Sequence, residues 1–84
     1  MKIILKLFAS LTDYLPAEAK YTNLIEIDIA PDTSIAELVE QHRLPARLVH
    51  LVLVNGSYIP PEQRAGRTLA AGDALAIWPP IAGG

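Results

Sequence analysis

The chain has 84 residues, 51% of them hydrophobic, and a formal charge of −2 at pH 7. This length suits a single domain with one core. Cysteine is absent, which excludes disulfides, thiolate metal sites and a nucleophilic thiol, so any sulfur chemistry must use sulfur from outside the chain. Lys and Arg are scattered, and no apolar run approaches the roughly 20 residues of a membrane helix. We expect a cytoplasmic protein that binds neither nucleic acid nor membrane.

The first third of the chain predicts two strands. Residues 2–8 are large or β-branched and alternate between two faces. Residues 24–29 alternate isoleucine with acidic residues, as in a strand that is buried on one side only. The two segments predict a hairpin with a long connection.

A short helix is expected next. Pro31 and Asp32 end the second strand, and Ser34 and Glu37 form a capping box in which each side chain bonds the amide of the other residue. Pro45 should end the helix after about two to three turns. Apolar and half-polar residues recur at helical spacing and predict one buried stripe, namely Ile35, Leu38, Val39 and His42.

The second half of the chain predicts three more strands. Residues 50–54 are apolar on both faces, and the turn signal Asn55-Gly56 leads into a short strand at residues 57–59. A second turn signal at residues 72–73 precedes the last strand, residues 74–78. This order predicts an α+β sheet with one helix across one face, over residues 1–78.

The C-terminal sequence resembles that of the MoaD/ThiS sulfur carriers. A Gly-Asp turn at residues 72–73, a last strand, Pro79-Pro80 and Gly83-Gly84 occur in the order found in that family, and the sequences Leu7-Phe8-Ala9 and Val54-Asn55-Gly56 and the capped Ser34 helix also fit. The ending Pro-Pro-x-Ala-Gly-Gly is most similar to that of the molybdopterin synthase small subunit. Residues 43–49 depart from the best-known subunits. The resemblance implies a ubiquitin-like β-grasp fold, a mixed sheet of about five strands with one main helix packed on one face and with parallel first and last strands.

The resemblance also implies a function for the C-terminus. In this family an E1-like adenylyltransferase uses ATP and Mg to adenylate the terminal carboxylate, and a sulfur donor enzyme converts the product to a thiocarboxylate. Gly84 would carry the acyl group, and Gly83 has no Cβ to obstruct a narrow partner channel. The acceptor would be the large subunit of molybdopterin synthase, in molybdenum cofactor biosynthesis. The chain itself would be a non-catalytic co-substrate without a permanently bound cofactor or metal.

Residues 79–84 are predicted to form an extended tail. Pro79 and Pro80 have a fixed φ and favour a polyproline conformation, which directs Ile81 and Ala82 away from the domain. At about 3.3 Å per residue the tail would reach roughly 20 Å. This length would carry Gly84 into a partner's pocket.

Strand alternation predicts the two faces of the sheet. The face toward the helix is assigned Ile3, Leu5, Leu7, Ile25, Ile27, Ile29, Val52, Val54, Leu75 and Ile77, and the opposite face is assigned Ile4, Phe8, Leu51, Leu53 and Trp78. An uncovered apolar face commonly marks a partner contact, and the resemblance places Phe8 and Trp78 near the partner interface. The predicted partner-binding residues are Phe8, Leu51, Leu53, Trp78, Pro79, Pro80, Ile81 and Ala82. Alternatively, Phe8 and Trp78 are ordinary core or loop-covered residues.

Other interpretations stay open. The chain could carry sulfur for thiamine synthesis or tRNA thiolation, act as a protein modifier joined to lysines, or be a β-grasp interaction domain without an activated end. Arg64 and Arg67 are expected to be solvated, with contact to a phosphate or an acidic partner as the alternative. His42 and His50 lack the neighbours of a metal or acid-base site, and Asp73 is expected to serve its turn.

Overall fold

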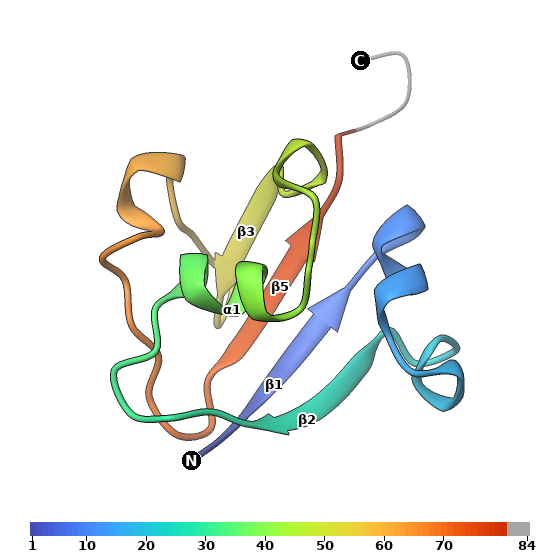
Figure 1. The fold of residues 1–84 in the computed structure, drawn as a ribbon, viewed down its shortest axis with the longest axis horizontal. Helices are drawn as coiled ribbons and strands as arrows, with labels where there is room; N and C mark the ends of the chain where they lie inside the picture. The colour runs from blue at the N-terminus through green and yellow to red at the C-terminus, as the bar shows by residue number, and fades with distance from the viewer. Residues whose placement is uncertain (81–84) are drawn as a thin grey trace.

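The protein folds into a five-stranded mixed sheet with one α-helix packed against one face (Figure 1). The computed structural model describes residues 1–80. The strands are β1 (Lys2–Leu7), β2 (Leu24–Asp28), β3 (Leu51–Val54), β4 (Ser57–Tyr58) and β5 (Ala74–Trp78), and the helix is α1 (Ile35–Gln41). Short 3-10 turns cover Ala9–Tyr14, Ala17–Ala19, Ala46–Leu48 and Pro61–Gln63. Within residues 1–80, no helix combines the length and the apolar character needed to cross a membrane.

The strand order is β2-β1-β5-β3-β4. β1 and β5 are parallel neighbours, with Leu5 opposite Leu75, whereas β1 pairs antiparallel with β2, and β3 with both β4 and β5. This topology confirms the predicted hairpin and the predicted parallel pairing of the first and last strands. Of the five predicted strands, the first four are one residue shorter than expected at one end, a usual uncertainty for boundaries.

The helix-side face of the sheet holds the core, as predicted. Its residues are buried except for Ile25 and Ile27, which are half-buried against the core. Further core leucines come from irregular segments and were not predicted, namely Leu11, Leu15, Leu44 and Leu69. Leu7, Leu11 and Leu15 recur every four residues, which is a visible apolar spacing, whereas the positions of Leu44 and Leu69 depend on tertiary packing.

Helix α1 starts as predicted and ends earlier than predicted. The Glu37 N–H donates to the Ser34 Oγ at 3.1 Å, and the Ser34 N–H donates to the Glu37 Oε1 at 3.0 Å, which completes the capping box. These bonds from Ser34 hold the pKa of Glu37 below its ordinary value. The helix ends at Gln41, ahead of Pro45, because Arg43 takes a positive φ of 57° and turns buried Leu44 back toward the core.

Both predicted turns are confirmed. Asn55 and Gly56 have φ values of 50° and 85°, and Gly72 has a φ of 86°. Asp73 serves its turn, because its Oδ2 accepts from the Ala70 N–H at 2.8 Å and its Oδ1 accepts from the Asn55 Nδ2 at 2.9 Å. These two bonds, the one from Ala70 first, hold the pKa of Asp73 below its ordinary value.

Candidate docking face and tail base

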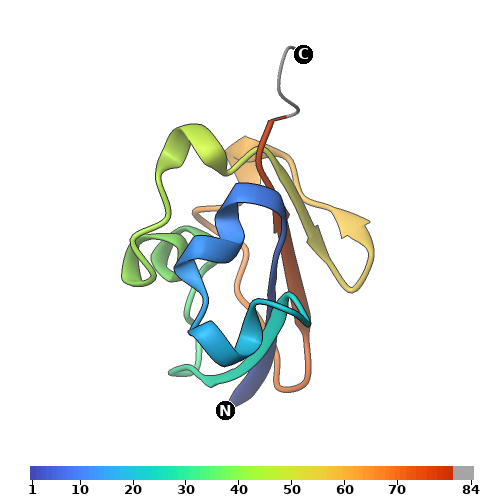
Figure 2. The same cartoon turned by 90° about the vertical axis from the view of Figure 1, so that its right-hand side faces the viewer.

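The sheet face opposite α1 carries the predicted docking residues. In the side view of Figure 2, α1 and the Ala46–Leu48 turn lie on one side of the sheet. On the other face, Leu51 lies opposite Trp78, and Leu53 lies between Ala76 and Tyr58. The alternation of the strands therefore gathers these side chains on one surface, which we call the outer face.

An aromatic pair marks the end of the outer face from which the C-terminal segment departs. The Phe8 and Trp78 rings are stacked, with their centroids 4.1 Å apart and an interplanar angle of 3°. Both residues are half-buried. Neither residue belongs to the hydrophobic core, so an ordinary core position is wrong for both, while the alternative of loop-covered residues stays open.

The backbone at this point is held from both sides. The Phe8 N–H donates to the Ile77 carbonyl at 3.2 Å, and the His50 N–H donates to the Trp78 carbonyl at 3.1 Å. Half-buried Pro79 and exposed Pro80 follow directly. β5 is thus fixed between β1 and β3 up to its last residue, and this sets where the following segment leaves the sheet.

The exposure of the outer face is uneven. Leu51 is 37% exposed, whereas Ile4 and Leu53 are half-buried. Two further exposed apolar residues border this face and were not predicted, Tyr58 at 53% and Leu24 at 39%. The sequence did contain a signal for Tyr58: a hairpin with its turn at Asn55-Gly56 places Tyr58 opposite Leu53.

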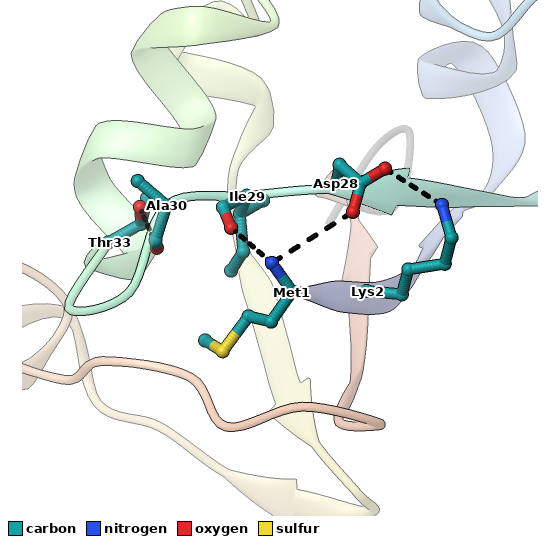
Figure 3. Close-up of polar contacts among 6 residues, drawn as sticks. All are labelled: Met1, Lys2, Asp28, Ile29, Ala30 and Thr33. Carbon is teal, nitrogen blue, oxygen red and sulfur yellow. Dashed lines mark hydrogen bonds and ion pairs between the residues drawn. The ribbon is translucent and has the colours of Figure 1, made fainter.

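An ion pair between β1 and β2 lies at the other end of the sheet, near the N-terminus. The Lys2 Nζ donates to the Asp28 Oδ2 at 2.8 Å, which raises the pKa of Lys2 and lowers that of Asp28 (Figure 3). The Met1 ammonium donates to the Ile29 carbonyl at 2.8 Å. Because β1 and β5 are parallel, this ion pair is remote from Trp78. Lys6, which pairs with Ala76, adds one charged side chain to the outer face close to the aromatic pair.

The two loop arginines differ, and the expectation of a solvated Arg64 is wrong. Arg64 is only 9% exposed, and its guanidinium donates to the carbonyls of Ile59, Val49 and His50 at 3.1, 3.2 and 2.9 Å. Arg67 is exposed, as expected. The sequence does not reveal this difference, because Arg64 bonds backbone carbonyls, which every residue has, and not a particular side chain.

The remaining candidates are distributed as follows. His42 is half-buried, and its Nδ1 lies 3.0 Å from the Leu38 carbonyl oxygen, while His50 is exposed. Four residues of the predicted tail lie outside the described part of the chain, namely Ile81, Ala82, Gly83 and Gly84. Their roles, and the division between residues 1–78 and 79–84, stay predictions.

Comparisons with known proteins agree with this architecture. A crystal structure of SAMP1 from Haloferax volcanii has 30% identity and a TM-score of 0.65, with coverage of 100% of both chains. A crystal structure of the Haloferax volcanii small archaeal modifier protein 1 has 29% identity and a TM-score of 0.61, covering 95% of this chain and 98% of that chain. The solution structure of the HVO 2177 protein of the same organism has 23% identity and a TM-score of 0.74, covering 100% of this chain and 87% of that one, and it supports the fold alone.

Family membership follows from the sequence itself. No curated protein matches the sequence. The model of the ThiS family matches residues 6–84, nearly the whole chain and its last residue included. The chain is therefore a ubiquitin-like β-grasp protein of the ThiS family.

Proposed function

We propose that this protein is a sulfur carrier whose reactive group is the carboxylate of Gly84. The observation that carries the proposal is the ThiS family match, which runs through Gly83 and Gly84 to the end of the chain. The described residues add a firmly held β5 that ends at Trp78 beside an apolar surface.

The chemistry takes place on a partner. A carboxylate oxygen of Gly84 attacks the α-phosphorus of ATP in an E1-like adenylyltransferase, and pyrophosphate leaves. Sulfur supplied at the sulfide level by a donor enzyme then attacks the acyl carbon. The bond to AMP breaks, and a thiocarboxylate remains on Gly84. ATP and Mg belong to the activating partner, and this chain supplies the acyl group.

The outer face is the proposed docking surface for that partner. Phe8, Leu51, Leu53 and Trp78 share one face, and Trp78 immediately precedes Pro79. A partner that covers this surface would therefore receive the segment from Pro79 to Gly84 at a fixed starting point. Proline restricts the backbone before binding, which reduces the entropy lost when the segment enters a channel.

We propose that the thiocarboxylate transfers its sulfur to the molybdopterin precursor. This transfer would take place in the large subunit of molybdopterin synthase. The ending Pro-Pro-x-Ala-Gly-Gly supports this choice over thiamine synthesis or tRNA thiolation. Docking on the large subunit would use the same outer face. Activation and delivery would then exclude each other, because the partners compete for one surface.

Intact-mass analysis tests the proposal. The chain is incubated with a ThiS-family activating enzyme, Mg-ATP and a sulfur donor. We expect a mass gain equal to the replacement of one oxygen by sulfur, confined to the C-terminal peptide, and no gain in a chain that lacks Gly84. An unchanged mass with several activating enzymes would contradict the proposal.

A protein modifier is the second candidate. It is favoured by the 29% identity to a structure named as a small archaeal modifier protein, over 95% of this chain. A lysine amine of a target would displace AMP and form an isopeptide bond. Conjugates on a denaturing gel that disappear on removal of Gly84 would support this function, and their absence together with thiocarboxylate formation would leave the carrier alone.

A further inference from the structure

A groove on the helix side of the molecule reaches the aromatic end of the outer face, because its lining residue Leu51 lies opposite Trp78. Its volume is about 620 Å³, and it lies between α1, the start of β3, β4 and the Pro61–Gln63 turn. The apolar walls include Ala36 and Val39 of α1, and Leu51 and Tyr58 belong to both the groove and the outer face. Within its described lining the groove contains no acidic residue.

Arg64 gives the groove a buried positive charge. Of the five N–H donors of a guanidinium, three bond the backbone carbonyls of Ile59, Val49 and His50, and the other two have no acceptor within residues 1–80. Among residues 1–80, no carboxylate lies within ion-pair distance of Arg64. A buried charge without a counterion is unfavourable, so an anion that reaches this guanidinium gains strong charge-assisted hydrogen bonds. His50 adds a second nitrogen-bearing side chain to the lining.

We propose that this groove binds the C-terminal segment of a second copy of the chain, residues 81–84. That segment combines an isoleucine and small residues with the Gly84 carboxylate on which the proposed function also rests. These groups match apolar walls around a guanidinium that has no carboxylate partner among residues 1–80. The carboxylate of Gly84 would bond Arg64, and the Ile81 side chain would contact Val39 and Tyr58.

A second copy fits better than the same chain. The chain up to Pro80 continues past the end of the sheet and away from α1 (Figure 1), and prolines favour an extended path. The complex would withhold the Gly84 carboxylate from an activating partner at high protein concentration. This self-association does not require that any enzyme adenylates Gly84, although an adenylated Gly84 would lose the free carboxylate and with it the bond to Arg64.

A titration followed by NMR tests the proposal. Isotope-labelled full-length chain is mixed with a synthetic peptide of residues 79–84, either as the free acid or as the C-terminal amide. We expect the acid to shift the signals of Ala36, Val39 and Tyr58. The amide should bind about ten-fold more weakly, because it loses the charged hydrogen bonds to Arg64.

Variants assign the site. Tyr58→Ala removes a groove wall and leaves the bonds of Arg64 in place, and it should weaken binding of the acid by about five-fold or more. Arg67→Met removes an exposed arginine outside the groove and should leave binding unchanged. Arg64→Lys, checked for folding by circular dichroism, should reduce the preference for the acid over the amide.

Three results would overturn the proposal: equal affinity for acid and amide, shifts confined to Phe8 and Trp78, or no shift at millimolar peptide. Deletion of residues 81–84 gives a fourth outcome. The NMR signals of the groove residues are compared between the full-length and the shortened chain. If they differ at every protein concentration, the groove binds the C-terminal segment of the same chain, and the proposal of a second copy is wrong. None of these outcomes bears on the mass gain at Gly84, so the two proposals fail independently.

Discussion

The rings of Phe8 and Trp78 lie parallel, 3° from coplanar orientation and 4.1 Å apart between centroids. This contact joins the end of β1 to the last residue of β5, immediately before Pro79. Trp78 is also the only tryptophan of the chain, so its fluorescence reports on the point from which the C-terminal segment departs.

Removal of the Phe8 ring should destabilise the domain. Phe8→Ala is expected to lower the free energy of unfolding by about 1–2 kcal/mol, because it removes an aromatic stack and half-buried apolar area. Urea denaturation followed by circular dichroism measures the change, and Trp78 fluorescence should shift as the indole becomes more exposed. Tyr21→Ala, at a side chain that is 94% exposed, should change the free energy by less than about 0.5 kcal/mol. Equal effects of the two substitutions would contradict this assignment.

The buried arginine should matter far more for stability than its exposed neighbour. Arg64→Met is expected to lower the free energy of unfolding by about 2–4 kcal/mol, because three carbonyls lose a charged donor. The matched substitution Arg67→Met removes an exposed side chain whose Nε donates to the adjacent Thr68 carbonyl, at 3.2 Å. It should cost less than about 0.5 kcal/mol. Thermal or urea unfolding measures the free energy of unfolding of both variants. Similar losses in the two variants would contradict the assignment.

The capping box predicts the effect of a single hydroxyl. Ser34→Ala should lower the free energy of unfolding by about 1 kcal/mol, because the Glu37 N–H loses its acceptor at the start of α1. Ser10→Ala, at an exposed position in the Ala9–Tyr14 turn, serves as the control and should be nearly neutral. A cost for Ser10→Ala as large as that for Ser34→Ala would show that the cap contributes nothing specific.

Asp73 should contribute stability that depends on pH. Its pKa in the folded state is held below the ordinary value of 3.8 by the Ala70 N–H and the Asn55 amide. The folded state therefore favours the carboxylate, so this stabilisation is present above pH 3.8 and is lost as the pH falls through the folded pKa. Asp73→Asn should cost up to about 1 kcal/mol near neutral pH, since the turn is partly solvated. Urea denaturation over a pH series should show this difference shrinking in acid, and a constant difference would contradict the assignment.

Regular patterns in the sequence predicted most of the sheet. The isoleucines of residues 24–29 and the Asn55-Gly56 turn carry local signals, and both appear where expected. The parallel pairing of β1 with β5 came from the family resemblance, because strand neighbours are not encoded by chain order.

Long-range contacts account for what the sequence did not show. Leu44 and Leu69 fill the core from segments without periodic spacing. Arg64 is indistinguishable from Arg67 until Val49 and His50, far along the chain, are seen to present their carbonyls. The Phe8–Trp78 contact likewise depends on β1 and β5 being neighbours.

Carboxylate activation itself is the most direct test of the central proposal. The ATP–pyrophosphate exchange rate of a ThiS-family activating enzyme would be measured with three chains: the unmodified chain, a chain lacking Gly84, and a chain extended by one alanine after Gly84. We expect exchange above background with the unmodified chain only, since the enzyme must reach a carboxylate borne by a terminal glycine. Equal exchange rates with all three chains would contradict the account.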